Sequence, residues 1–230
     1  MIMYDLKIFN ISDIYLFVAL AFILPKIPVV GKFFNMINTL IHELGHALFA
    51  LPFDASVKTI ELYKDTSGAT TITSKNKFGS IIISLAGYLF ASVFSYFSFY
   101  LIHVGYQKGF LFMVSIIAIF MLLLWIRNSY GIIWVIIFAA ANSYVLFLKP
   151  DWINHVALLY ATFIGVEALF SSFVILYLSL FNRQAAGDAT ILAKQTKIPA
   201  LVWGLLFAAF SSYTAILILV NFFDIPIWKF

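Results

Sequence analysis

The sequence contains no cysteine and little charge. The lack of cysteine excludes disulfides, thiolate metal ligands and a cysteine nucleophile, so histidine and carboxylate side chains are the strong metal ligands that remain. Charged residues make up 10% of the 230 positions, whereas about 25% is usual in a soluble domain. Hydrophobic residues make up 63%, and the mean hydropathy is +1.02. These values exclude an ordinary soluble protein and predict an integral membrane protein with several spans.

Basic clusters are lacking as well. The net charge is +4, but Lys and Arg fall at the ends of apolar segments, where they set membrane orientation. No basic run is interleaved with aromatic residues in a polar domain, so we do not expect a nucleic-acid partner. Residues 1–13 lack a compact basic region and a small-residue cleavage site. We therefore expect the first apolar stretch to be an uncleaved membrane segment.

The apolar stretches predict an all-α polytopic membrane protein with six or seven transmembrane helices in a single domain over residues 1–230. The first stretch, 14–24, meets Pro25 and Pro28, and it spans a membrane only if it continues, kinked, towards Phe34. Five later stretches approach or exceed the roughly 20 residues that a span needs. They cover residues 81–102, 110–126, 132–148, 152–181 and 198–223.

Two polar segments interrupt this pattern. In the longer one, 54–77, β-branched residues flank a turn-forming Asp-Thr-Ser-Gly at 65–68, which predicts a β-hairpin. The other, 182–197, is predicted to be a polar connector. With seven alternating spans, nine Lys and Arg residues lie on the side of the hairpin and the connector, and five lie on the other side. The positive-inside rule then places the hairpin and the connector in the cytoplasm.

The pattern HELGH at 42–46 carries the chemistry, and the helix that contains it is predicted to cover about residues 35–51. His42 and His46 lie four residues apart, so on a helix both imidazoles face the same side and can reach one metal ion, with Glu43 beside it to activate a water. This is the HExxH arrangement of zinc hydrolases. Its flanks are apolar, and a charged residue at the centre of a membrane helix costs roughly 2.5–3.5 kcal/mol. We therefore expect Zn²⁺ held by His42 and His46, with Glu43 as the general base.

A catalytic zinc site needs a third protein ligand. The candidates are Asp54, Asp151, His155, Glu167 and Asp188. A turn explains Asp54, a helix N-cap explains Asp151, and a position near the end of a span explains His155. Glu167 lies inside an apolar run and must face a cavity, a partner or a metal. Asp188 lies on the same predicted side of the membrane as the end of the motif helix. Its alternative explanation is a helix N-cap. These arguments leave Asp188 and Glu167 both open.

Arg127 and Asn128 end an apolar span on the side of the hairpin. An arginine at a membrane boundary is ordinarily an interfacial anchor. Asn128 has an amide that can donate a hydrogen bond to a substrate carbonyl or an oxyanion. We treat both residues as candidates for substrate or transition-state support.

Taken together, these pieces resemble the site-2-protease family of membrane zinc metallopeptidases, in particular its compact bacterial branch. HExxH alone is shared by unrelated peptidases, whereas the ordered set of pieces is more specific. The matching segments are NTLIHELGHALFAL at 38–51, SGAT at 67–70, LAGY at 85–88, IRNSYG at 126–131, GDA at 187–189 and PALVW at 199–203.

The resemblance implies a metal bound by His42 and His46, with Glu43 as the catalytic carboxylate. It also implies that an aspartate from a later segment completes the metal site, and Asp188 is the matching position. Better-known members carry this ligand in an Asp-Gly pair within a transmembrane helix, whereas this chain has Gly187-Asp188 in a connector. Glu167 stays the alternative.

The function implied by this resemblance is hydrolysis of membrane-protein or peptide substrates in the lipid bilayer, most simply in a bacterial plasma membrane. The hairpin edge is a candidate for receiving an unwound substrate as an added strand, which a proline at Ile60 or Ile72 should impair without removing metal. One competing hypothesis is a non-catalytic membrane protein with a structural or zinc-handling metal. Another is a transporter with an ion site at Glu167 and His155. The sequence carries no signal for an oligomeric state.

Overall fold

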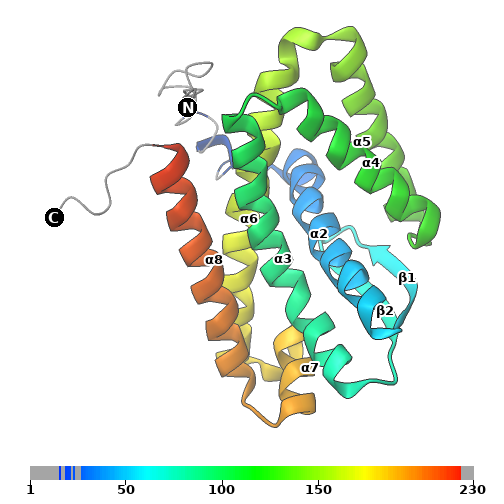
Figure 1. Ribbon diagram of the computed structural model, residues 1–230, viewed down its shortest axis with the longest axis vertical. Coiled ribbons are helices and arrows are strands. Elements are labelled where there is room, and N and C mark those ends of the chain that lie inside the picture. The colour runs from blue at the N-terminus through cyan, green and yellow to red at the C-terminus, as the bar shows by residue number, and fades with distance from the viewer. Residues whose placement is uncertain (1–15, 17–18, 22, 24–26, 224–230) are drawn as a thin grey trace, which may run out of the picture.

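The computed structural model describes residues 16, 19–21, 23 and 27–223, and these are helical apart from one small sheet. Figure 1 shows an elongated helix bundle with the sheet on one flank. The elements are α2 (Pro28–Ala50), η2 (Leu51–Phe53), β1 (Ser56–Leu62), β2 (Gly68–Thr73), α3 (Lys77–His103), α4 (Gln107–Leu124), α5 (Ser129–Leu148), η3 (Pro150–Trp152), α6 (Ile153–Phe181), η4 (Arg183–Ala185), α7 (Gly187–Thr196) and α8 (Ala200–Phe222).

Five helices in the described part of the chain are long and apolar enough to cross a membrane. They are α3, α4, α5, α6 with the preceding η3, and α8, and they coincide with the five later apolar stretches of the sequence. The first expected span, 14–24, lies largely outside the described residues. The motif helix α2 is not among the five, because its polar residues lower its hydropathy. The expectation of an all-α polytopic membrane protein is confirmed.

The outer surface of the bundle is apolar, as a lipid environment requires. Large hydrophobic side chains are exposed along the spans, and an exposed apolar surface of this extent is not stable in water. Examples from four helices are Ile116, Ile119 and Leu123 of α4, Ile133, Ile136 and Ile137 of α5, Phe173, Val174 and Tyr177 of α6, and Val202 and Leu205 of α8. The chain is therefore an integral membrane protein.

Helix α2 carries the HELGH pattern and begins earlier than the sequence predicts. It starts at Pro28 rather than near residue 35, because a proline is tolerated in the first turn, where its missing N–H is not needed. It ends at Ala50, and after η2 the chain turns at Asp54, which has a left-handed φ of 53°. Its buried face packs most extensively against α3, with further contacts to α6 and both strands.

The predicted hairpin is present as an antiparallel pair, β1 and β2. The outer edge of β1 is occupied by the link between α4 and α5. The Ile60 N–H donates to the Trp125 carbonyl at 2.8 Å, and the Arg127 N–H donates to the Ile60 carbonyl at 3.3 Å. On α2, the Thr39 hydroxyl donates to the Thr66 carbonyl at 2.7 Å and so holds the turn of the hairpin. The hairpin is thus tied to the bundle at both its edge and its turn.

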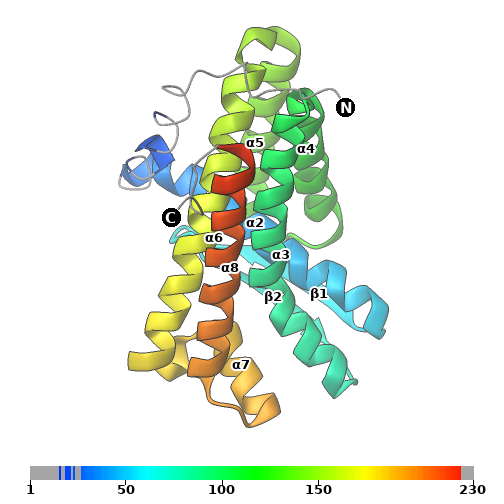
Figure 2. The same cartoon turned by 60° about the vertical axis from the view of Figure 1, so that its left-hand side comes forward.

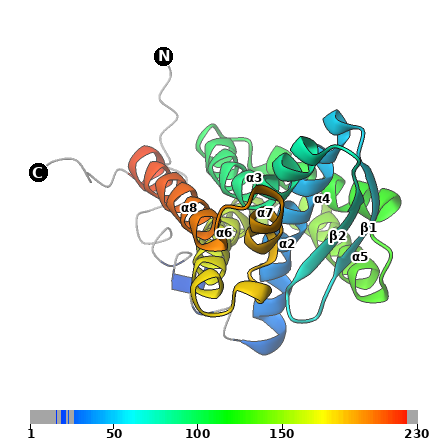
Figure 3. The ribbon, with the colours of Figure 1, turned by 90° about the horizontal axis from the view of Figure 1, so that it is seen from below.

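The predicted polar connector contains a short helix, α7. Gly187, with a φ of +46°, allows the sharp turn that starts this helix. Its buried residues Ala189 and Leu192 pack in a small apolar cluster with Phe207 of α8, and Gln195 donates to the Ser80 hydroxyl of α3 at 2.6 Å. The hairpin and α7 lie in the lower half of the bundle, and the α3–α4 and α5–α6 turns lie at its top (Figures 1 and 2). Seen from below, α7 lies beside α3 and α8, and the hairpin lies along α2 (Figure 3).

Candidate metal centre and active site

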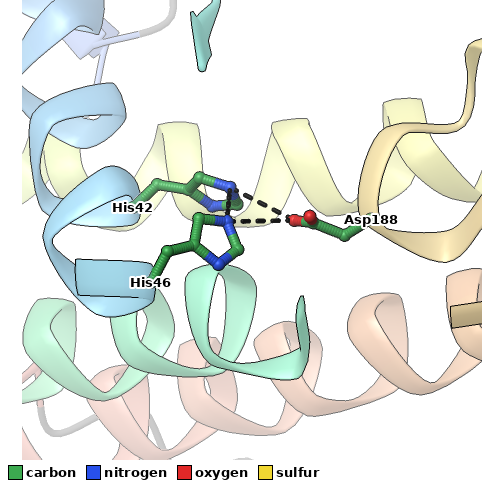
Figure 4. Close-up of side chains that lie close together, drawn as sticks. All are labelled: His42, His46 and Asp188. Atoms are coloured by element: carbon green, nitrogen blue, oxygen red, sulfur yellow. Dashed lines mark hydrogen bonds and ion pairs between the residues drawn. The ribbon is translucent and has the colours of Figure 1, made fainter. Parts of the chain in front are cut away.

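Three side chains from two distant segments meet at one point. Figure 4 shows the imidazoles of His42 and His46 on α2 and the carboxylate of Asp188 on α7 pointing towards one another. The two histidine Nε2 atoms lie 3.1 Å apart. Asp188 Oδ2 lies 3.4 Å from Nε2 of His42 and 3.3 Å from Nε2 of His46. Among the residues that the structure describes, these three form the one group of at least three His and carboxylate side chains close enough to hold a metal ion.

The dimensions of this group suit zinc. Ligand atoms about 2.0–2.1 Å from a tetrahedral zinc lie roughly 3.3 Å from one another, and the three distances here are 3.1, 3.3 and 3.4 Å. Two imidazole nitrogens and one carboxylate oxygen are also a donor set that zinc accepts, with the fourth position left for water or substrate. The donor atoms therefore fit the metal that the sequence predicts.

The surroundings prepare His46 and Asp188 to act as ligands. His46 Nδ1–H donates to the Ile83 carbonyl at 2.7 Å, so this nitrogen carries the proton and Nε2 keeps its lone pair for a metal. Burial by itself raises the pKa of the Asp188 carboxyl, but its interactions with the His46 and His42 side chains outweigh burial and hold this pKa well below its ordinary value. Asp188 is therefore ionised.

Gly87 on α3 makes the room that the two imidazoles occupy. A Cβ built on this residue would lie 2.6 Å from Nε2 of His42 and 2.6 Å from Nε2 of His46. Both distances are far below van der Waals contact, and both atoms are the proposed ligand atoms. Glycine at this position therefore lets α3 pack against the metal site.

Replacing Gly87 by alanine should remove most of the bound metal, because the new methyl group displaces both imidazoles. The measurement is metal content per purified chain together with the unfolding temperature. Gly165→Ala on α6 is the matched control, since a Cβ there meets Phe99 at an ordinary 3.5 Å and should leave metal content unchanged. Full metal content in Gly87→Ala would contradict the ligand geometry.

Glu43 lies beside the three ligands and is held by the hairpin. Its side chain is buried, and Oε2 accepts a hydrogen bond from the Thr70 hydroxyl of β2 at 2.5 Å. The three candidate ligands, Glu43 and Thr70 all line one cavity of about 470 Å³. The cavity is bounded by α2, β2, the start of α3 and the start of α7. A carboxylate next to a metal site in such a cavity can take a proton from a water.

A family comparison agrees with this geometry. The family model described as peptidase M50B-like matches residues 14–218. The chain belongs to the peptidase M50B-like family. The resemblance to the site-2-protease family is thereby confirmed. No curated protein and no solved structure matches the chain.

In this M50B-like chain, the other acidic and histidine candidates lie away from the metal group. Glu167 on α6 lines a neighbouring cavity, and among the described residues it joins no metal-binding group. His155 lines a separate hollow near the start of α6. It precedes Glu167 by 12 residues, about 18 Å along a helix, so the two do not form the single ion site that the transporter hypothesis requires. Asp54, in the turn that follows η2, and Asp151, in η3, are both exposed.

Asn128 and Arg127, the candidates for substrate or transition-state support, both bond to the backbone of this chain. Asn128 Oδ1 accepts from the Leu62 N–H at 3.1 Å, and its Nδ2 donates to the Leu62 carbonyl at 2.6 Å. The guanidinium of Arg127 donates to four backbone carbonyls at and beyond the end of α4. Asn128 therefore extends the pairing along the outer edge of β1, and Arg127 caps α4. Asn128 and the backbone N–H of Arg127, which donates to the Ile60 carbonyl, hold this edge of the hairpin.

Sequence reasoning missed the roles of Thr70 and Tyr88 in this M50B-like site. Thr70 reaches Glu43 only because β2 lies along α2, and a threonine in a strand carries no chemical signal of its own. Tyr88 packs edge-on against His42, with the ring centroids 4.5 Å apart, and lines the cavity. Its position one residue after Gly87, in the LAGY segment, was the available clue.

Proposed function

We propose that this M50B-like protein is a zinc metallopeptidase that hydrolyses peptide bonds of membrane-protein or peptide substrates. The observation that carries the proposal is the meeting of His42, His46 and Asp188 beside Glu43 in one cavity. A structural metal site is normally closed by four protein ligands, whereas three ligands with a neighbouring carboxylate and open space are typical of hydrolytic sites. The family match supports a peptidase.

The residues of the site divide the chemistry among them. Zinc, when bound by His42, His46 and Asp188, supplies a Lewis acid that lowers the pKa of a water and polarises a carbonyl. Glu43 accepts the proton of the attacking water and later gives it to the leaving nitrogen. Thr70 holds Oε2 of this carboxylate, which leaves Oε1, on the side of Gly68, for the water.

Cleavage of a membrane-protein substrate by purified protein, with and without a chelator, tests the proposal. Chelation should lower cleavage to the background rate, and added Zn²⁺ should restore it, because the three ligands remain in place. Metal content measured in the same samples shows whether cleavage is lost and restored together with the bound zinc. Cleavage that persists after the metal has been removed would exclude a metallopeptidase.

The hairpin offers a place where a substrate can bind as an added strand. Ile60 of β1 directs its N–H and carbonyl away from β2, so its partner Thr70 must also direct both groups outward. Alternate residues point the same way, so the N–H and carbonyl of Ile72 also lie on this edge. Among the described residues no strand pairs with the edge, and Gly68, Thr70 and Ile72 line the cavity. An extended substrate on this edge passes Glu43.

A proline at Ile72 should impair cleavage about tenfold or more, because it removes an edge N–H while leaving the β1–β2 pairing intact. Ile72→Ala is the control, since it removes the side chain but keeps the N–H. Rates with a membrane substrate and metal content are the measurements. Equal rates for the two variants would exclude strand addition at this edge. Proline at Ile60 is not an equivalent test, because its N–H bonds to Trp125.

The setting of the reaction belongs to the same proposal. The hairpin and α7 lie in the same half of the bundle (Figure 1). With seven alternating spans, nine of the 14 Lys and Arg residues fall on their side, which supports a cytoplasmic position for the active site. We place the protein in a bacterial plasma membrane, with the lipid bilayer and a membrane-protein or peptide substrate as its partners and no nucleic acid.

A further inference from the structure

A second cavity, of about 370 Å³, adjoins the metal site on the other side of the hairpin turn. Its walls come from α2, the turn at 65–68 and α6. His42, Glu43, Gly68 and Tyr88 line both cavities, so the two spaces meet at the catalytic carboxylate. A residue close to the scissile bond of a substrate therefore has this second cavity within reach.

Helix α6 presents Glu167 to this cavity. Glu167, Phe170, Ser171 and Val174 all line it, and their spacing of three, four and seven residues places them on one face of the helix. Among the described residues, no side chain donates a hydrogen bond or forms an ion pair with the Glu167 carboxylate. A carboxylate within an apolar span normally has a partner or a function. A partner for the Glu167 carboxylate therefore has to come from outside the described residues.

The lining of this cavity carries hydrogen-bond acceptors but no lysine or arginine side chain. No Lys or Arg is among its lining residues, whereas Asp65 lines it together with Glu43 and Glu167. The Oδ1 atom of Asn38, on the α2 wall, is buried without a hydrogen-bond partner among the described residues. Asp65 accepts from the N–H and hydroxyl of Ser67, and Glu43 accepts from Thr70, whereas Glu167 and the Asn38 Oδ1 atom accept no side-chain hydrogen bond among the described residues. An occupant with several N–H donors and a positive charge complements them.

We propose that this cavity receives a Lys or Arg side chain of the substrate next to the scissile bond, with Glu167 as the residue that determines this specificity. The inference rests on the proposed peptidase function. A substrate strand on β2 runs past Gly68, where the two cavities meet, and its side chain there enters the space between α2 and α6. The pairing gives the Glu167 carboxylate the cation that the described chain does not provide.

Binding of short peptides tests the proposal directly. The protein carries Glu43→Gln so that bound peptide is not cleaved, and fluorescently labelled peptides differ only in having Lys, norleucine or Glu at one position, moved in turn through the residues around the cleavage site. Glu167→Gln and Glu167→Lys are made in the same background. Asp151→Asn, an exposed carboxylate in η3 far from the cavity, is the matched control. Metal content per chain checks that every variant keeps its site.

We expect the Lys peptide to bind about tenfold more tightly than the norleucine peptide at one position, and Glu167→Gln to abolish that preference. Glu167→Lys should reverse it in favour of the Glu peptide, and Asp151→Asn should change nothing. Equal binding of the three peptides to the Glu167 protein at every position, or an equal loss for all three in Glu167→Gln, would overturn the proposal. Cleavage by the Glu43 protein separates the two hypotheses: charge-selective binding without cleavage refutes only the peptidase, and cleavage without charge preference refutes only the Glu167 pocket.

Discussion

Replacing Glu43 by glutamine should lower peptide hydrolysis by about 10²–10⁴-fold and leave the bound metal in place. Glutamine keeps the shape of the side chain and can still pair with Thr70, but it cannot take a proton from water. The loss is that of a general base, which typically contributes a factor of this size. Glu43 is not one of the three side chains grouped as ligands, so metal content should stay at about one ion per chain.

The control for this change is Glu61→Gln. Glu61 also lies in the hairpin region, but its carboxylate accepts from Tyr63 and does not line either cavity around the metal site. Rates with a membrane-protein substrate should be nearly unaffected in this variant. A wild-type protein that binds zinc but has no peptidase activity to lose would instead favour the non-catalytic metal protein. Full activity in Glu43→Gln would remove Glu43 from the mechanism.

Replacing Asp188 by alanine should weaken metal binding by more than about 100-fold, whereas Glu167→Ala should leave it unchanged. Asp188 contacts both histidines, and its loss removes one of three ligands and a negative charge. Even residues that only orient a ligand typically change metal affinity by about 10–100-fold, so loss of a ligand is expected to exceed that. Glu167 lies in the neighbouring cavity and outside the metal group.

Metal content per chain in detergent-purified wild type, His46→Ala, Asp188→Ala and Glu167→Ala is the measurement. About one zinc in the wild type, lost with His46 and Asp188 only, would identify the third ligand. Loss with Glu167 and retention with Asp188 would reverse the assignment. A wild type that binds no metal when zinc is supplied would leave HELGH as a packed polar patch and remove the basis of the peptidase proposal.

Features that depend on neighbouring residues along the chain could be predicted. The five spans follow from apolar stretches of sufficient length, and the hairpin follows from β-branched residues on either side of a turn. His42 and His46 share a face because four residues make about one helical turn. The start of α2 was placed too late, because Pro25 and Pro28 suggested a break, whereas Pro28 is in fact the first residue of the helix.

The roles of Asn128 and Arg127 could not be predicted in the same way. Both are polar residues at the end of a span, and their type is equally compatible with substrate binding, interfacial anchoring or capping. The outcome for Asn128 depends on β1, which is more than 60 residues earlier in the chain and lies against the α4–α5 link. The guanidinium of Arg127 bonds instead to carbonyls at most five residues earlier. The contact between β1 and the α4–α5 link covers the outer edge of β1 and leaves the outer edge of β2 free among the described residues.

The sequence by itself determined that this is a polytopic membrane protein, that one helix carries two histidines on one face with a glutamate between them, and that a hairpin follows. It left the third ligand open between Asp188, the position that matches the family, and Glu167 as the alternative. Only the tertiary structure separates them, since it brings the start of α7 to within 3.4 Å of both imidazoles and leaves Glu167 in the adjoining cavity. The physical reason is that a metal site is defined by distances between side chains. Those distances depend on how α2, α3, α7 and the hairpin pack, and local periodicity carries no information about that packing.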